Sequence, residues 1–162
     1  MKNILVIGAG RSAVTLIKYL LDKSLTNNWQ VTVADFSEDL AKDAVASHTN
    51  GKAIFFNVTD EKQRHKEIAD ANIVISMLPA SLHIIVAKDC VRLRRDLVTA
   101  SYVSEEIAQL DEYAKKSGVL LLNEIGLDPG IDHMSAMQVI DNIKYKGGEL
   151  ISFKSFCGGL VH

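Results

Sequence analysis

The chain has 162 residues, 18 basic and 20 acidic side chains, a net charge of −2 and two cysteines. This is the length of one ordinary domain, and the interspersed charges argue against nucleic-acid or anionic-membrane partners. No apolar run approaches the roughly 18 residues of a membrane span. Neither the cysteines, Cys90 and Cys157, nor the five histidines show metal-ligand spacing. We therefore expect a soluble cytoplasmic protein without a bound metal.

The first motif is a glycine-rich turn in residues 4–13, Ile-Leu-Val-Ile-Gly-Ala-Gly-Arg-Ser-Ala. An apolar run leads into Gly8-X-Gly10-X-X-Ala13 and then into a helical pattern, which is typical of a strand–turn–helix unit that binds a pyrophosphate. Gly8 allows the tight turn, Gly10 lets a phosphate approach the backbone, and Ala13 lets helix and strand pack closely. Backbone N–H groups and the helix dipole then favour an anion without any charged side chain.

A carboxylate ends the next expected strand, residues 30–35. Asp35 stands where the dinucleotide-binding fingerprint places an acid, about 20 residues after the glycines with some tolerance for a longer loop. A carboxylate there accepts hydrogen bonds from ribose hydroxyls and repels a 2′-phosphate, so Asp35 predicts NAD, with NADP less favoured. The alternative is a solvated aspartate that caps the following helix.

Apolar strand patterns alternate with helical patterns along most of the chain. Strands are expected near residues 3–7, 30–35, 53–57, 72–77, 96–99 and 118–122, and helices near 11–24, 38–48, 61–69, 80–93, 104–117 and 131–146. Ser37, Asp60 and Ser104 each precede acidic residues, as N-caps do. This alternation predicts an α/β fold, a Rossmann-type doubly wound parallel sheet with helices on both faces.

The last segment follows Gly147-Gly148 and predicts a further strand over 149–157, which runs into Gly158-Gly159-Leu160. We therefore divide the chain into a dinucleotide-binding domain, 1–148, and a strand, 149–162, that leads out toward an absent substrate domain. The fold is expected to be truncated before that domain. The exposed sheet edge of a truncated fold makes a homodimer one expected form of assembly.

Two further motifs follow the fifth and sixth expected strands, Val98-Thr-Ala-Ser-Tyr102 and Asn123-Glu-Ile-Gly-Leu-Asp-Pro-Gly-Ile-Asp-His133. Both lie at the edge of the sheet where open α/β folds bind ligands. Asp128-Pro129-Gly130 predicts a rigid turn into a helix N-terminus, which points backbone N–H groups into the crevice. Ser101 and Tyr102 add hydroxyls that can donate to a carboxylate or carbonyl.

These motifs resemble the saccharopine dehydrogenase family, and the nearest likeness is its glutamate-forming branch. The resemblance rests on Ile75-Ser-Met-Leu-Pro79 followed by His83, on Val98–Tyr102, on Gly126-Leu-Asp-Pro-Gly-Ile-Asp-His-Met134 and on Ser155-Phe-Cys-Gly-Gly-Leu160. It covers essentially the whole chain. It implies an NAD(P)-dependent oxidoreductase of lysine metabolism. Such an enzyme oxidises the secondary amine of saccharopine to an imine, whose hydrolysis releases glutamate and 2-aminoadipate 6-semialdehyde.

The resemblance also implies roles for individual residues. The adenosine diphosphate half would contact Gly8, Gly10, Arg11, Ser12 and Asp35, and the adenine would lie against Asn57 and Val58. The nicotinamide end would lie against Leu78, Ala100, Leu127 and Pro129. The substrate, saccharopine or a similar amino-dicarboxylate, would contact Ser101, Tyr102 and Asp128. No catalytic acid or base is assigned.

The chain departs from the family near its end, where Val161 stands at a position that is usually proline and the substrate domain is missing. Because that domain supplies most of the arginines for the substrate carboxylates, we expect cofactor binding without turnover. The chain would be a fragment or a degenerate paralogue. Two alternatives stay open: a nucleotide-sensing regulatory module without catalysis, and a related imine-forming amino-acid or polyamine dehydrogenase.

Five further side chains are interpreted individually. His83 is expected to be a packed or hydrogen-bonded helix residue rather than a general base. His133 lies in a first helical turn, where the helix dipole would lower its pKa, and its structural and substrate-side roles are equally favoured. Met134 and Met137 are expected to face the core. Tyr102 is expected to orient substrate, with a buried phenol as the alternative.

Overall fold

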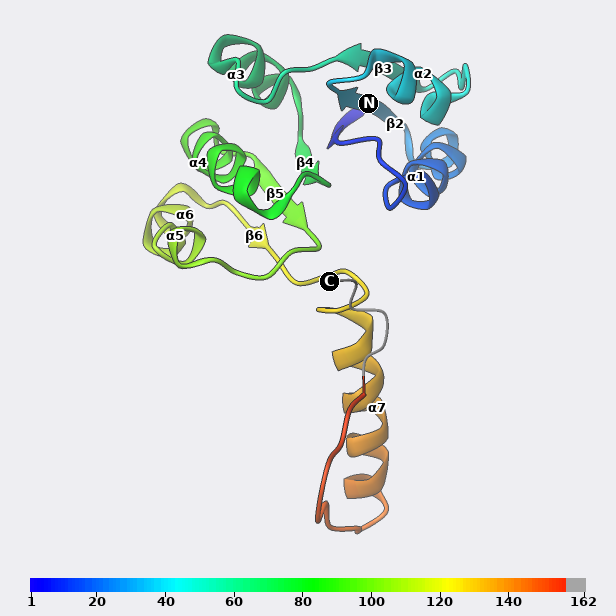
Figure 1. The fold of residues 1–162 in the computed structure, drawn as a ribbon, viewed down its shortest axis with the longest axis vertical. Helices are drawn as coiled ribbons and strands as arrows, with labels where there is room; N and C mark the ends of the chain where they lie inside the picture. Colours follow the sequence, from blue (N-terminus) through cyan, green and yellow to red (C-terminus); the bar gives the residue numbers. More distant parts are fainter. Residues whose placement is uncertain (157–162) are drawn as a thin grey trace.

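The computed structural model describes residues 1–156 of the chain and consists of an α/β body from which one long helix extends (Figure 1). All six strands are parallel, in the order β3-β2-β1-β4-β5-β6. The strands are β1 (Lys2–Ile7), β2 (Trp29–Asp35), β3 (Gly51–Phe55), β4 (Ile73–Ser76), β5 (Asp96–Thr99) and β6 (Leu121–Leu122). The helices are α1 (Val14–Asn27), α2 (Glu38–Val45), α3 (Glu61–Asp70), α4 (His83–Leu93), α5 (Glu105–Ala108), α6 (Asp111–Ser117) and α7 (Ile131–Tyr145). The predicted doubly wound parallel sheet is confirmed.

The central strand β1 is buried on both faces, as its unbroken apolar run predicts. Leu5 and Ile7 pack with residues of α3 and α4 such as Ile68 and Val86. The alternate positions Ile4 and Val6 pack with residues of α1 and α2, among them Ile17 and Ala41. The two faces of the sheet therefore support two separate cores, which fix the strand in its register.

Three helices begin at residues whose side chains cap the helix N-terminus. The three predicted N-caps are confirmed, because the side chains of Ser37, Asp60 and Ser104 accept hydrogen bonds from the N–H groups of residues 40, 63 and 107. Some helix bounds differ from the prediction. The first helix begins at Val14 after a turn, a 3-10 turn (Ala80–Leu82) precedes α4, and the helix expected over 104–117 is divided into α5 and α6.

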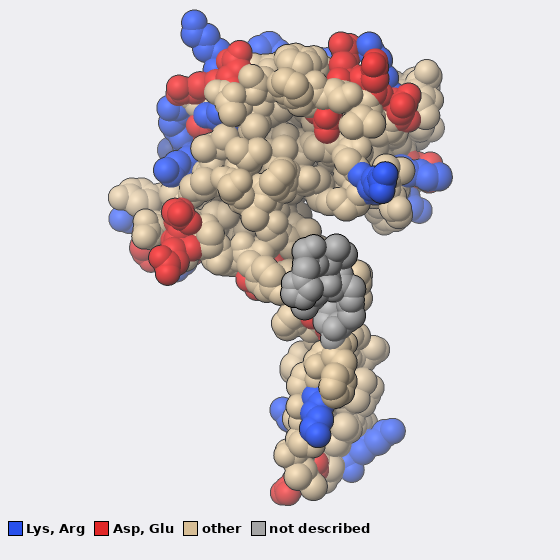
Figure 2. All heavy atoms as spheres, in the orientation of Figure 1, with Lys and Arg blue, Asp and Glu red and all other residues tan. Residues whose placement is uncertain are grey.

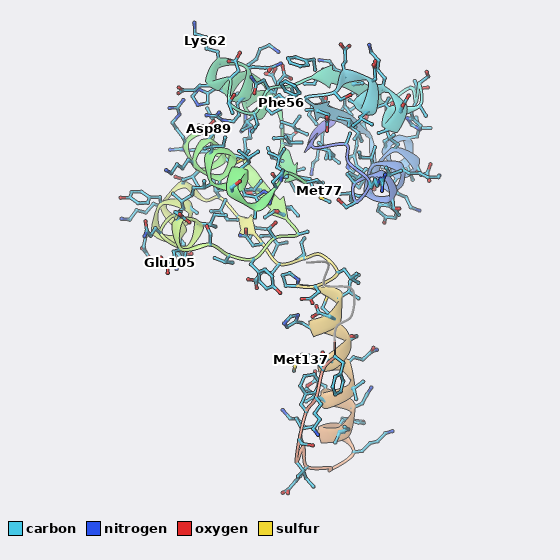
Figure 3. All side chains as sticks on the ribbon, in the orientation of Figure 1. Phe56, Lys62, Met77, Asp89, Glu105 and Met137 are labelled. Carbon is cyan, nitrogen blue, oxygen red and sulfur yellow. The ribbon has the colours of Figure 1, made fainter. Side chains whose placement is uncertain are left out.

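Helix α7 stands clear of the sheet (Figure 1) and buries none of its residues. The prediction that its methionines face the core is therefore wrong: Met134 is 59% and Met137 48% exposed, and Met137 is labelled on this helix in Figure 3. The strand expected from residue 149 is also absent over 149–156, where no neighbouring strand supplies a ladder of hydrogen bonds. Its remainder lies outside the described residues.

The surface carries both signs of charge around the α/β body, without a single basic face on the side seen in Figure 2. None of the helices within residues 1–156 combines the length and the apolar character that crossing a membrane requires.

A buried ion pair joins α3 to α4. Arg64 Nε lies 2.5 Å from Asp89 Oδ2, and the two side chains are only 10% and 8% exposed. Asp89 Oδ1 lies 2.7 Å from His65 Nε2, and Arg64 Nη1 donates to the Val58 carbonyl at 2.6 Å. Because Val58 belongs to the loop before α3, this network positions that loop as well as the two helices. Asp89 is labelled on α4 in Figure 3.

Replacing Asp89 with alanine tests how much this network contributes to the stability of the fold. The substitution leaves the Arg64 guanidinium buried without its carboxylate, which is expected to lower the free energy of unfolding by about 3–5 kcal/mol. The control is Asp111→Ala, which breaks an exposed i,i+4 pair with Lys115 and is expected to cost about 0.5 kcal/mol or less. Urea unfolding followed by circular dichroism measures both. Equal losses in the two variants would contradict a structural role for the buried pair.

Candidate functional site

The glycine turn has the geometry that its sequence predicts. Gly8 has a φ of +106°, and a Cβ added there would lie 2.9 Å from the Met77 carbonyl oxygen, so only glycine fits between β1 and the end of β4. Met77 is labelled at this edge of the sheet in Figure 3. Gly10 is exposed and has no atom within 4 Å of an added Cβ, which leaves its backbone open to a ligand. The turn therefore fits a phosphate group.

Arg11 and Ser12 follow on the exposed side of this turn, while Ala13 is fully buried. The Ala13 N–H donates to the Gly10 carbonyl at 2.9 Å, and α1 then begins without a side-chain N-cap. The first N–H groups of an uncapped helix can bind an anion. The turn thus brings together four of the residues predicted to contact the adenosine diphosphate half of the cofactor: Gly8, Gly10, Arg11 and Ser12.

Asp35 accepts hydrogen bonds from two backbone N–H groups. Its Oδ2 accepts a hydrogen bond from the Ala9 N–H at 2.7 Å, and its Oδ1 accepts one from the Ser37 N–H at 2.8 Å. The helix-capping alternative is not what forms, since Ser37 caps α2. Sequence reasoning missed that Asp35 fixes the glycine turn, because this contact depends on the pairing of β1 with β2, in which Ile7 lies opposite Ala34.

A crevice of about 260 Å³ lies beside Asp35 at the carboxyl ends of the strands. Asn57, Val58 and Leu78 line it together with Ile7, Ala34, Asp35, Phe36, Phe56 and Leu82. The Asn57 N–H donates to Gln63 Oε1 at 2.9 Å, which holds this loop against α3. Apolar walls with one carboxylate at the rim suit a flat heteroaromatic ring joined to a sugar. Two of the lining residues, Asn57 and Val58, are those predicted to border an adenine.

A second hollow, of about 360 Å³, lies between the end of β5 and the turn before α7. It brings together five of the predicted site residues, Ala100, Ser101, Tyr102, Asp128 and Pro129, with Ala80, Val103 and Ser104. The four residues predicted for the nicotinamide end do not form one cluster. Leu78 lines the first crevice, and Leu127 is 76% exposed and lines neither hollow.

The turn before α7 is closed by small residues, which places Asp128 at the second hollow. The Gly126 N–H donates to the Pro129 carbonyl at 2.8 Å, and Asp132 Oδ1 accepts from the Gly130 N–H at 2.9 Å. Gly130 has a φ of +146°, and a Cβ there would collide with the backbone of Gly126. The Asp128–Pro129 peptide is cis. The loop has no room for larger side chains at these glycines.

Tyr102 and Asp128 are joined across the second hollow. The Tyr102 hydroxyl donates to Asp128 Oδ1 at 3.0 Å, and Tyr102 is 61% exposed, so the alternative of a buried phenol is wrong. The hydrogen bond to Asp128 and the charge of that carboxylate raise the pKa of Tyr102. The phenol therefore keeps its proton to a higher pH than an ordinary tyrosine.

His133 has a different pKa shift from the one predicted. Its Nδ1 lies 2.7 Å from Asp132 Oδ1, and this hydrogen bond and the charge of Asp132 raise the pKa of His133. The expected lowering by the helix dipole is thus wrong, because an adjacent carboxylate contributes more than the helix terminus.

His83 is buried and hydrogen-bonded, as predicted. It is 1% exposed, its Nδ1 lies 2.9 Å from Ser76 Oγ, and its Nε2 lies 2.7 Å from Ser101 Oγ. Sequence reasoning did not connect Ser76 or His83 with the substrate residues, and the only signal was their position before and after Leu78-Pro79. Among residues 1–156, no three histidine, cysteine, aspartate or glutamate side chains are grouped so as to hold a metal ion.

Comparisons with known proteins agree with this geometry. Residues 4–122 match the family model of the saccharopine dehydrogenase NADP binding domain, and residues 126–162 match that of the saccharopine dehydrogenase C-terminal domain. The chain is 41% identical over 159 residues to saccharopine dehydrogenase [NADP(+), L-glutamate-forming] of Saccharomyces cerevisiae, covering 98% of this chain and 35% of the yeast protein. It is 45% identical over 130 residues to alpha-aminoadipic semialdehyde synthase of Arabidopsis thaliana, covering 80% of this chain and 12% of the plant protein.

Superposition on a solved structure points to the same family. The apo form of saccharopine dehydrogenase (L-Glu forming) from Saccharomyces cerevisiae superposes with a TM-score of 0.82 and 37% identity, over 91% of this chain and 32% of that chain. The chain thus spans about a third of the yeast protein. The family model that covers most of the α/β body, together with this superposition, confirms the resemblance seen in the sequence: the chain belongs to the saccharopine dehydrogenase family.

Proposed function

We propose that this chain is the NADP(H)-binding part of a saccharopine dehydrogenase-like oxidoreductase of lysine metabolism. The reaction is hydride transfer between the nicotinamide and the secondary amine of saccharopine, followed by imine hydrolysis to glutamate and 2-aminoadipate 6-semialdehyde. One observation carries the proposal. The glycine turn with its crevice and the Tyr102–Asp128 hollow lie at the carboxyl ends of the same sheet, where open α/β sheets bind ligands.

The second hollow favours an enzyme over a nucleotide-sensing module. A sensor needs only the glycine turn and the adenine-side crevice, whereas the hydroxyls of Ser101 and Tyr102 and the carboxylate of Asp128 suit an amino-acid substrate. The bound nicotinamide would supply the hydride, and the protein would supply position and electrostatics. A related imine-forming dehydrogenase would use the same groups, and the family match favours saccharopine as substrate.

The chain alone is proposed to bind the cofactor without turnover. The described residues that line the second hollow include no arginine or lysine, although a substrate with several carboxylates needs such partners. The cytoplasmic location and the homodimer remain predictions.

The cofactor is proposed to be NADP(H), which corrects the preference for NAD expected from Asp35. The matching family model and the yeast relative both carry NADP in their names. Two features of the structure support the change. Both carboxylate oxygens of Asp35 accept hydrogen bonds from backbone N–H groups, which offset the charge of Asp35. Arg11 is exposed and lies two residues after Ala9, whose N–H donates one of these hydrogen bonds. We assign Arg11 as the partner of the 2′-phosphate.

Titration of the chain with NADPH and NADH, followed by energy transfer from Trp29, tests the cofactor assignment. The wild-type chain is expected to bind NADPH more tightly than NADH. Arg11→Met should weaken NADPH binding roughly tenfold or more and leave NADH binding unchanged, because only NADPH carries the 2′-phosphate. Lys18→Met, on the exposed face of α1, is the matched charge control and should change neither affinity. Equal losses for both cofactors in Arg11→Met would contradict the assignment.

The link between Tyr102 and Asp128 makes a separate prediction. Asp128→Asn removes the negative charge that raises the phenol pKa, so the pKa of Tyr102 should fall toward its ordinary value. Absorbance titration of phenolate formation measures the change, and Tyr102→Phe identifies the signal among the four tyrosines. Asp111→Asn removes an exposed carboxylate elsewhere and serves as the control. An unchanged titration curve in Asp128→Asn would show that the two side chains are not coupled in solution.

A further inference from the structure

Four side chains form a buried polar network beneath the second hollow. Ser76 ends β4, His83 begins α4, and Thr99 and Ser101 lie at the end of β5. Ser76 is 0%, His83 1% and Thr99 1% exposed. His83 Nδ1 lies 2.9 Å from Ser76 Oγ, and His83 Nε2 lies 2.7 Å from Ser101 Oγ and 3.3 Å from Thr99 Oγ1. Of the four, Ser101 lines the hollow.

The surroundings of the imidazole in this network favour its neutral form. Burial lowers the pKa of His83, and its position as the first residue of α4 places it at the positive end of a helix dipole. A neutral imidazole has one nitrogen that donates a hydrogen bond and one that accepts. The direction of one serine bond therefore fixes the direction of the other.

The surroundings of Ser76 decide that direction. Within the described residues, the Ser76 hydroxyl has His83 Nδ1 as its single hydrogen-bond partner. If Nδ1 carried the proton, the hydroxyl proton of Ser76 would be buried without an acceptor, which is the costly arrangement. Ser76 must therefore donate to Nδ1, and the imidazole proton must lie on Nε2.

The other side of the ring agrees with this assignment. An Nε2–H group can donate to Ser101 Oγ and, more weakly, to Thr99 Oγ1. In the reverse arrangement, both hydroxyls would compete for the one lone pair on Nε2. Thr99 Oγ1 also accepts a hydrogen bond from the Ser101 N–H at 3.3 Å. With Nε2–H as the donor, the hydroxyl proton of Ser101 is left for a ligand in the hollow.

We propose that His83 is a positioning residue, which holds Ser101 as a hydrogen-bond donor toward the second hollow. The neighbouring Tyr102 has the opposite polarity, because its hydroxyl donates its proton to Asp128 and leaves oxygen lone pairs exposed. The hollow thus offers a donor at Ser101 and acceptors at Tyr102 and Asp128. This arrangement orients an amino acid, with its carboxylate at Ser101 and its ammonium or secondary ammonium group at Asp128. The substrate class rests on the proposed function.

Nitrogen NMR of the chain with ¹⁵N-labelled histidine tests the proposal directly. In the wild-type chain, His83 should give the spectrum of the Nε2–H tautomer. Ser76→Ala should release the tautomer, so that the Nδ1–H form becomes populated, and Ser76→Thr should restore Nε2–H because it keeps the hydroxyl. Ser101→Ala should leave the tautomer unchanged. If His83 only filled space, its tautomer would not depend on the Ser76 hydroxyl in this way.

Two results would overturn the proposal. One is an Nδ1–H tautomer or an imidazolium in the wild-type chain at neutral pH, and the other is a tautomer that changes in Ser101→Ala but not in Ser76→Ala. If a variant fails to fold, the wild-type spectrum alone decides the matter. The measurement needs neither cofactor nor substrate. Failure of NADPH or saccharopine to bind would therefore count against the proposed function and not against this hydrogen-bond direction.

Discussion

The parallel pairing of β1 with both β2 and β4 is the constraint on which the rest of the structure depends. In this register Ile7 lies opposite Ala34 on one side and Ser76 on the other. The next residue, Gly8, is therefore enclosed between Asp35 and Met77, and the turn that follows opens at the carboxyl edge of the sheet. The two cores on either face of β1 hold this register. The glycine turn and the crevice beside Asp35 depend on it.

Polar side chains at this edge are held in place by hydrogen bonds to their neighbours. Asp35 is bound by two backbone N–H groups, which makes it part of the turn. The Tyr102 hydroxyl is hydrogen-bonded to Asp128, and the Ser101 hydroxyl is hydrogen-bonded to the buried His83. The same edge therefore has the glycine turn at its centre and, to one side, a hollow lined by both donor and acceptor groups. Together these features support the proposal that a cofactor and a small amino-acid substrate meet at one sheet edge.

The order of strands and helices could be predicted because apolar runs and the N-caps Ser37, Asp60 and Ser104 are local signals. The candidate site residues could be proposed because the glycine turn and the two later motifs follow strands. Other features depend on tertiary contacts. The periodicity of α7 indicated an apolar face but not whether anything covers it, and the strand expected at 149 found no partner. The partners of Asp35 depend on strand register, so the sequence did not show that two backbone N–H groups bind its carboxylate.

A dinucleotide is proposed to bind at the carboxyl edge of the sheet through the glycine turn and the Asp35 crevice. Mapping backbone amide shifts in the ¹⁵N-labelled chain during NADPH addition tests it most directly. The largest shifts are expected at residues 8–13 and 57–58, and the amides of α7 are expected not to shift. A larger hollow of about 550 Å³ lies at the opposite edge, lined by Asn3, Thr32 and Lys52 among others. Shifts centred there, or no shifts at saturating NADPH, would contradict the account.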